Sequence, residues 1–313
     1  MASGEEGKGE TVLVTSASGF IGSTLVRGLL GPATTSAPAS STPVSSTSTA
    51  PHSPALLSRQ RHHDAGRKAG PLPATRSSSS PRWCADDRAE TDHLLALAAG
   101  AGDGRLSFFR CGLLDGAALL DATRGCSGVF HLASPCTVDP VKDPQNQLMV
   151  PAVEGTRNVV RAAKDAGGVR RVVVTSSISA IVPSPGWPAD EVLDERCWTD
   201  IDYCEKNGVW YPASKALAEK AAWKFAEENG LDVVVVNPGT VLGPMIPPAI
   251  NASMAMFCRL LKIQFKFSKD TQPGLVREEV GSKKLIALGL QVTPMEKIIR
   301  DAVESLKSRG HIS

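Results

Sequence analysis

The chain of 313 residues lacks any continuous apolar run of about 20 residues, the length that a membrane-spanning helix requires. Residues 1–10 are acidic and contain no apolar stretch of the kind found in secretory signals. The net charge of +2 gives no reason to expect a nucleic-acid partner. We therefore expect a soluble, cytoplasmic protein that binds neither membrane nor nucleic acid.

The seven cysteines show no CxxC pair and no spacing typical of metal ligands. An odd and scattered set of cysteines indicates reduced thiols rather than a disulfide framework. The sequence therefore predicts no metal site.

The first structured pattern is a strand, a glycine turn and a helix. Residues 11–15 (TVLVT) are continuously apolar or β-branched, as in a strand buried on both faces of a parallel sheet. The turn SASGFIG follows at 16–22, and an amphipathic helix pattern runs from 23 to 30. A dinucleotide pyrophosphate binds at such a helix N-terminus, with Gly19 admitting the phosphate and Gly22 allowing close helix–strand packing. An ordinary turn without a ligand is the alternative.

Residues 32–82 differ sharply in composition, because about half of them are Ser, Thr or Pro and few are large and apolar. Such a segment buries too little apolar surface to offset the entropy cost of ordering it. We expect 32–82 to be a disordered, low-complexity insert whose scattered basic residues are solvated. A dinucleotide-binding fold would place its second strand here, and no convincing strand pattern is present.

Strand and helix patterns alternate through the rest of the chain. Further strands are expected at 106–110, at 128–135 with its end at the proline, at 171–175 and at 232–236. Helices are expected at 87–97, 117–123, 153–166, 215–229 and after a capping box at 293–296. This alternation predicts an α/β fold, a Rossmann-like doubly wound parallel sheet with a small C-terminal lobe. The expected dinucleotide-binding domain comprises 1–31 and 83–245, and 246–313 form an incomplete, truncated substrate lobe.

Tyr211 and Lys215 lie four residues apart at the head of a strongly helical segment. Side chains with this spacing share one helix face, so the ammonium can lower a phenol pKa that starts near ~10. A tyrosine tuned in this way exchanges a proton with a substrate oxygen near neutral pH. A surface lysine beside a half-buried tyrosine is the alternative.

Two serines follow the strand at 171–175, where parallel sheets bind their ligands. A serine there can donate a hydrogen bond to a carbonyl oxygen, and Ser177 is the first candidate, with Ser176 as the alternative. His131 lies within an apolar strand and is better explained as a satisfied core histidine than as a base. Asn158 is equally a polar anchor or a packing residue.

Together these stretches resemble plant cinnamoyl-CoA reductase-like and dihydroflavonol reductase-like proteins, within the extended short-chain dehydrogenase/reductase family. The resemblance rests on the runs SASGFIGS, GVFHLASP, RRVVVTSS, ERCWTD, YPASKALAEKAAW and VVVVNPGTVLGP. It covers 11–31 and roughly 86–262. It implies an NADP-dependent reductase, with NAD possible, that acts on an aromatic aldehyde, ketone or acyl-CoA of the phenylpropanoid or flavonoid type.

The resemblance also implies roles for individual residues. Ser177, Tyr211 and Lys215 would form the catalytic triad. The cofactor would be held by Ser16, Gly19, Phe20, Ile21, Gly22, Ala133, Lys215 and Pro238. Arg82 is out of register with the arginine that usually reads the 2′-phosphate, and it has no assigned role.

The chain departs from the family pattern at several places. Ser16 replaces the first glycine of the phosphate turn, where a positive φ would cost about 1 kcal/mol. Gly112 replaces an aspartate that contacts the adenine. Residues 209–215 read VWYPASK instead of NWYCYGK, which favours a carbonyl reductase related to the cinnamoyl-CoA reductases proper. With the missing second strand and shortened lobe, these departures leave an alternative, an impaired relative or misspliced product that binds at most a nucleotide.

Overall fold

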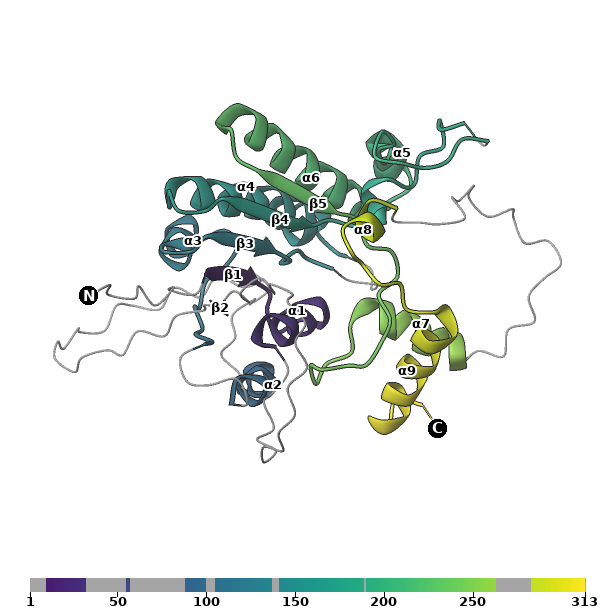
Figure 1. Cartoon of the computed structure of the whole chain (residues 1–313). Helices are drawn as coiled ribbons and strands as arrows, with labels where there is room; N and C mark the ends of the chain where they lie inside the picture. The colour runs from purple at the N-terminus through teal and green to yellow at the C-terminus, as the bar shows by residue number, and fades with distance from the viewer. Residues whose placement is uncertain are drawn as a thin grey trace, which may run out of the picture.

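The computed structural model describes residues 10–31, 55–56, 88–99, 105–136, 141–188, 190–262 and 283–312. In these residues the strands form one parallel sheet of order β2-β1-β3-β4-β5 (Figure 1). The strands are β1 (Thr11–Thr15), β2 (Ala55–Leu56), β3 (Gly128–His131), β4 (Arg171–Thr175) and β5 (Val233–Val236).

Helices cover both faces of the sheet. The α-helices are α1 (Phe20–Leu30), α2 (Arg88–Ala99), α3 (Gly116–Thr123), α4 (Val150–Asp165), α5 (Ile201–Lys206), α6 (Trp210–Asn229), α7 (Ala252–Lys262), α8 (Lys283–Ala287) and α9 (Met295–Ser308). A π-helix, η1 (Gln145–Met149), leads into α4, and a 3₁₀ turn, η2 (Ile178–Ala180), follows β4. Helices α3, α4 and α6 lie on one face and α1 and α2 on the other (Figure 1), which confirms the predicted doubly wound α/β fold.

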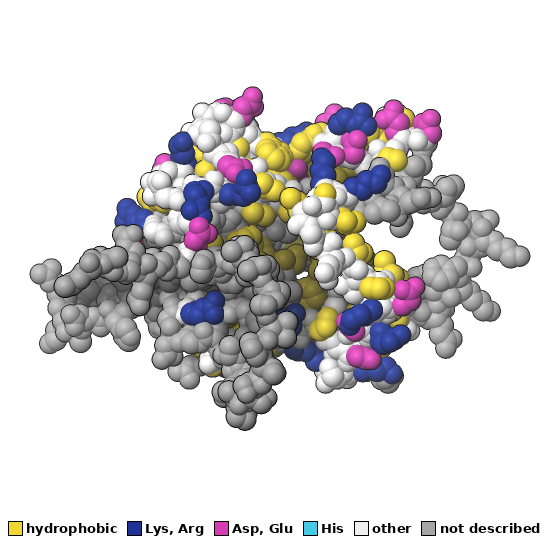
Figure 2. Space-filling view, viewed as in Figure 1, with side chains coloured by type: hydrophobic (Ala, Val, Ile, Leu, Met, Phe, Trp, Pro, Cys, Tyr) yellow, Lys and Arg dark blue, Asp and Glu magenta, His cyan; other side chains and the backbone are white. Residues whose placement is uncertain are grey.

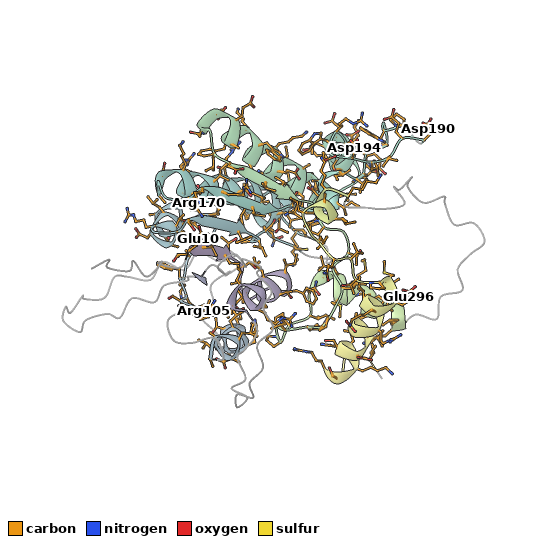
Figure 3. All side chains as sticks on the ribbon, viewed as in Figure 1. Glu10, Arg105, Arg170, Asp190, Asp194 and Glu296 are labelled. Atoms are coloured by element: carbon orange, nitrogen blue, oxygen red, sulfur yellow. The ribbon has the colours of Figure 1, made fainter. Side chains whose placement is uncertain are left out.

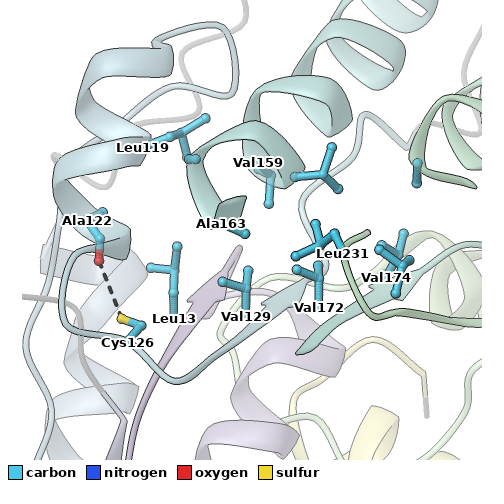
Figure 4. Packing of buried hydrophobic residues seen from close by; sticks show 14 residues of the cluster. Leu13, Leu119, Ala122, Cys126, Val129, Val159, Ala163, Val172, Val174 and Leu231 are labelled. Carbon is cyan, nitrogen blue, oxygen red and sulfur yellow. Dashed lines mark hydrogen bonds between the residues drawn. The ribbon is translucent and has the colours of Figure 1, made fainter. Parts of the chain in front are cut away.

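The two-residue period of β1 divides its side chains between the two cores. Leu13 packs with Val129 and Val172 under α3 and α4 (Figure 4). Val12 and Val14 point the other way, into a cluster with residues of α1 and α2. Both faces of the strand are therefore buried, as its continuous apolar run predicted.

Strand β2 corrects one expectation. Ala55 pairs with Thr11 and Leu56 with Val12, within a segment that showed no strand pattern. Two residues are too few for a period to be visible in the sequence. The remainder of 32–82, and the disorder expected for it, lies outside the described residues.

The strand expected at 106–110 is also wrong, because this segment is extended without ladder hydrogen bonds. Its Leu106 and Phe108 pack against the core on the α1 side, and Phe109 packs on the other. Both edges of β1 are already paired, so a strand here would need the outer edge of β2, which has two residues. The apolar residues of this segment are therefore explained by packing against the two cores and not by pairing in the sheet.

The C-terminal helices form a separate small core. Met254 of α7 and Leu306 of α9 are fully buried there, together with Met245. The predicted capping box is wrong, since Pro294 occupies the N-cap of α9 and no side chain caps the helix. Thr293 precedes the N-cap position by one residue and therefore cannot cap the helix. The predicted domain limits and the truncation of the lobe stay predictions.

Polar contacts tie the ends of these elements together. An ion pair joins Glu10, before β1, to Arg170, before β4 (Figure 3). Arg105 donates to the carbonyl oxygens of Leu29 (3.2 Å) and Leu30 (2.7 Å) and so closes the C-terminus of α1. On the face drawn in Figure 2, charged side chains lie over the outer helices and hydrophobic ones gather around the central hollow.

None of the helices in the described ranges has the length and apolar character needed to cross a bilayer.

Candidate active site

The glycine turn after β1 has the conformation that its sequence predicted. Ser16 adopts a positive φ of 56°, so the strain expected from a serine in place of glycine is present. The Gly19 amide donates to the Ser16 carbonyl oxygen at 3.1 Å and closes the turn. A Cβ on Gly22 would lie 2.2 Å from that same oxygen, so only glycine allows α1 to pack this closely.

The turn opens into a cavity of about 140 Å³ at the carboxyl end of β1. Its lining includes Ser16, Ala17, Ser18, Phe108, Leu113 and Ala133. Gly19 caps α1 without a side-chain hydrogen bond, and the first-turn amides of Phe20, Ile21 and Gly22 have no partner within the helix. Such amides, beside a glycine cradle, fit a dinucleotide pyrophosphate. The ring of Phe20 packs instead against the C-terminal core.

Thr15, the last residue of β1, is a positioning residue that the sequence did not single out. Its hydroxyl accepts hydrogen bonds from the amides of Leu132 and Ala133, both at 3.0 Å. It also bonds to Nδ1 of His131 at 3.1 Å. These bonds hold the loop after β3 against the glycine turn, at the point where the strand order reverses. The available sequence signal for Thr15 was its hydroxyl at the end of an otherwise apolar strand.

His131 is a satisfied core residue, as predicted. It is 3% exposed, and its Nε2 bonds to Thr156 Oγ1 at 3.1 Å. Burial, and secondarily the charge of Lys215, lower the pKa of His131 to about 3. A neutral imidazole locked between two hydroxyls braces the site and does not act as its base.

The three predicted catalytic side chains come together beyond the end of β4. Ser177 follows the strand, is 9% exposed, and its side chain hydrogen-bonds to Tyr211. Tyr211 and Lys215 lie in the first turns of α6. Both interact electrostatically with Cys136, which places them on the same side of their helix. Ser176 is also buried, but its hydroxyl has no partner in the described residues and Ser177 is the serine that reaches Tyr211.

The expected lowering of the Tyr211 pKa is wrong for this structure. Burial raises the pKa of Tyr211, and Cys136 raises it further through its charge and a side-chain hydrogen bond. The hydrogen bond from Ser177 acts in the opposite direction and is outweighed. The Lys215 ammonium donates to the Thr175 carbonyl oxygen at 3.2 Å, so it is engaged with the backbone. The phenol is therefore neutral at neutral pH.

Lys215 is 6% exposed, and burial lowers its pKa to about 8. The charges of Cys136 and Glu219 partly offset this effect. A lysine with this pKa remains mostly protonated at neutral pH, yet it titrates far closer to neutrality than an exposed one.

Residues after β5 support the serine. Asn237 donates to the Ser177 carbonyl oxygen at 3.1 Å and to a Glu219 carboxylate oxygen at 2.9 Å. The carbonyl oxygen of Pro238 accepts from the Ile178 amide at 2.9 Å. Pro238 therefore lies beside η2, and its contact with the cofactor stays a prediction. Sequence reasoning missed Cys136 and Asn237, because contacts between segments far apart in the chain decide their roles. It also missed Glu219, for which the spacing of four residues from Lys215 on one helix was the available signal.

On the side of the site expected to bind the adenosine, the structure shows the surroundings of Gly112 and Asn158. Asn158 donates to the Leu113 carbonyl oxygen at 3.0 Å and so anchors the segment that borders the cavity. A Cβ on Gly112 would meet no atom within 4 Å. The position of the missing aspartate is therefore open space.

In the described residues no group of three or more His, Cys, Asp or Glu side chains could hold a metal ion.

A glycine-turn cradle at the switch point of a doubly wound sheet, with a Ser-Tyr-Lys constellation beyond β4, defines a nicotinamide-dependent oxidoreductase of the short-chain type. The sequence profile of the NAD dependent epimerase/dehydratase family matches residues 12–265, and the chain belongs to this family. The predicted family, enzyme class and nicotinamide cofactor are thereby confirmed.

Several relatives are reductases. The chain is 34% identical to cinnamoyl-CoA reductase CAD2 of Medicago truncatula over 284 residues, covering 72% of this chain and 86% of that protein. It is 33% identical to cinnamoyl-CoA reductase 1 of Petunia hybrida over 286 residues, covering 72% and 84%.

Two solved structures share the fold. Vestitone reductase from alfalfa has a TM-score of 0.63 at 20% identity, covering 97% of this chain and 100% of that one. Yeast methylglyoxal/isovaleraldehyde reductase Gre2, complexed with NADPH, has a TM-score of 0.66 at 19% identity, covering 96% and 100%.

Proposed function

We propose that this protein reduces the carbonyl group of an aromatic compound of the phenylpropanoid or flavonoid type, with NADPH as the reductant. The convergence of Ser177, Tyr211 and Lys215 beyond β4 carries this proposal. Its substrate class is supported by the cinnamoyl-CoA reductases among the relatives. The sequence VWYPASK at 209–215 favours an aldehyde or ketone over a thioester.

The bound nicotinamide would supply a hydride to the carbonyl carbon. The amides at the start of α1 would hold the pyrophosphate, and Ala133, Lys215 and Pro238 would border the nicotinamide ribose. The hydroxyl of Ser177 would donate a hydrogen bond to the carbonyl oxygen and stabilise its developing charge.

Tyr211 would supply the proton. Because its pKa is raised, the phenol carries its proton at neutral pH, which is the state that a reduction requires. The ammonium of Lys215 would stabilise the phenolate that remains after transfer. The raised pKa of Tyr211 is thus compatible with the reductive direction, although it differs from the sequence expectation.

The variant Tyr211→Phe tests this role. We expect turnover to fall by about 10²–10⁴-fold, the contribution typical of a general acid, while NADPH affinity changes little. The measurement is NADPH oxidation with a panel of feruloyl-CoA, phenylacetaldehyde and a dihydroflavonol. Tyr203→Phe is the control, since Tyr203 lies on α5 and is 40% exposed. Near-normal turnover by Tyr211→Phe would remove the mechanism.

The alternative is a relative that binds the nucleotide but does not turn over, and thermal unfolding with NADPH separates the two. Ligand at about 100 times its Kd should stabilise the native state by about 2.7 kcal/mol. Stabilisation without reduction of any panel member would establish the alternative. If NADPH neither stabilises the protein nor is oxidised by it, the cofactor assignment for this chain is overturned.

A further inference from the structure

Glu219 lies one helical turn after Lys215 on α6 and is 8% exposed. A carboxylate this deeply buried requires hydrogen-bond donors. It has two: Asn237 Nδ2 at 2.9 Å and the indole Nε1 of Trp223 at 3.3 Å. Neither donor is charged, so neither explains why a carboxylate is buried here.

Glu219 and the Lys215 ammonium interact through their charges. Both side chains line one small polar cavity, together with His131, Ser134 and Ser176. The hydroxyls of Ser134 and Ser176 are buried there without a partner in the described residues. In such a space, shielded from solvent, charges interact far more strongly than at the surface.

The surroundings of Lys215 contain few other titratable groups. In the described residues they are His131 of β3, Cys136 in the loop after β3, and Tyr211 and Glu219 of α6. His131 is neutral, and Tyr211 is neutral at neutral pH because burial and Cys136 raise its pKa. Cys136, which is exposed to solvent, raises the Lys215 pKa through its charge more than Glu219 does. Among the buried groups, Glu219 is the one whose charge favours the Lys215 ammonium.

Glu219 is also linked to the catalytic serine. The side-chain amide of Asn237 that donates to Glu219 also donates to the Ser177 carbonyl oxygen, at 3.1 Å. One carboxylate thus connects to two of the three catalytic residues, to Lys215 by charge and to Ser177 through Asn237.

We propose that Glu219 is a positioning residue that keeps the buried Lys215 protonated and, through Asn237, fixes the backbone of Ser177. Its consequence for turnover rests on the proposed function, whereas its effect on the protonation of Lys215 does not. Glu219 touches neither substrate nor cofactor in this assignment.

A titration of Lys215 in the full chain tests the proposal without any substrate. Lysines labelled with ¹³C at Cε are followed by NMR, and the Lys215 signal is identified by its loss in Lys215→Met. Glu219→Gln should lower the Lys215 pKa from about 8, since one buried charge is removed at similar volume. Glu227→Gln, an exposed glutamate on the same helix, should leave it unchanged. An unchanged Lys215 pKa in Glu219→Gln would overturn the proposal.

A double-mutant cycle covers the case in which Glu219→Gln folds poorly. If Glu219 compensates the Lys215 charge, its replacement should cost less stability when Lys215→Met is already present. An equal loss in both backgrounds, or failure of both variants to fold, would assign Glu219 to the fold and overturn the proposal.

The pH profile of turnover separates this proposal from the proposed function. In Glu219→Gln the alkaline limb of kcat/KM should move to lower pH along with the Lys215 titration, and Glu219→Asp should restore most of the shift. A wild-type chain without turnover would contradict the proposed function and leave the NMR result as the test of Glu219. A shifted Lys215 pKa with an unmoved alkaline limb would refute the catalytic consequence.

Discussion

In the proposed mechanism, the protonation state of the Tyr211 phenol decides whether the site starts with a proton donor. Tyr211 is partly buried, and it contacts a thiol that opposes its negative form and a serine that favours it. Burial and the thiol together outweigh the serine, so the proton stays on the phenol. A site arranged in this way starts with its proton donor loaded, which suits reduction of a carbonyl group.

Replacing Cys136 should make Tyr211 more acidic. The protein has two tyrosines, so Tyr203→Phe leaves Tyr211 as the sole source of tyrosinate absorbance. In that background, Cys136→Ala removes a hydrogen bond and a charge that raise the Tyr211 pKa. We expect the absorbance titration to move to lower pH. Cys258→Ala, in the C-terminal core, is the matched control and should not move it. A midpoint that stays in place after Cys136→Ala would show that burial alone sets the pKa.

At the scale of elements, Gly22 determines how closely the glycine turn and α1 pack together. Gly22 sits in the first turn of the helix, directly against the Ser16 carbonyl. Gly28 lies in the same helix, but a Cβ there would meet nothing within 4 Å. The two glycines have the same helix propensity and opposite packing environments, so they form a matched pair.

The variants Gly22→Ala and Gly28→Ala should therefore change stability in opposite directions. A methyl group on Gly22 would fall 2.8 Å from the Ala17 Cα, and overpacking against backbone costs about 1–3 kcal/mol. Gly28→Ala should add up to about 1 kcal/mol through helix propensity. Urea unfolding measures both, and NADPH binding should weaken only in Gly22→Ala. A stable Gly22→Ala that binds NADPH normally would contradict this description of the turn.

At the scale of the whole molecule, the end of the chain supports the segment that follows β5. The Met245 amide donates to the Ser305 hydroxyl at 2.9 Å, and Arg309 donates to the Pro247 carbonyl oxygen at 2.9 Å. Phe20, which follows the glycine turn, packs into the same C-terminal core. Helix α9 thus stabilises both the loop beyond the active site and the base of the phosphate turn.

Leu306→Ala should destabilise the whole protein. The side chain is fully buried among Met245, Met254 and Cys258, and loss of a buried leucine costs about 2–5 kcal/mol. Ile299→Ala on the same helix removes a side chain that is 40% exposed and should cost below about 1 kcal/mol. Thermal or urea unfolding measures the difference. Equal losses at the two positions would show that α9 does not pack as described.

Local pattern was enough to predict most elements and the candidate triad. Three short-range signals each correspond to a feature of the structure: the β-branched run of β1, the alanine-rich sequence of α6, and the separation of Tyr211 and Lys215 by four residues. The positive φ of Ser16 could also be anticipated, because a turn of this shape constrains its own backbone. Strand β2 was missed and a strand at 106–110 was wrongly predicted, because pairing depends on a distant partner rather than on the local residues.

By itself, the sequence determined which side chains the site has: a phenol, an ammonium, a hydroxyl and a glycine cradle, each spaced along one element. Only the tertiary structure decided their protonation and their support. Cys136 and Asn237 come from the segments after β3 and β5, and folding brings them beside the helix that carries Tyr211, Lys215 and Glu219. Burial and charge act through space, so a pKa belongs to the folded molecule and not to the order of its residues.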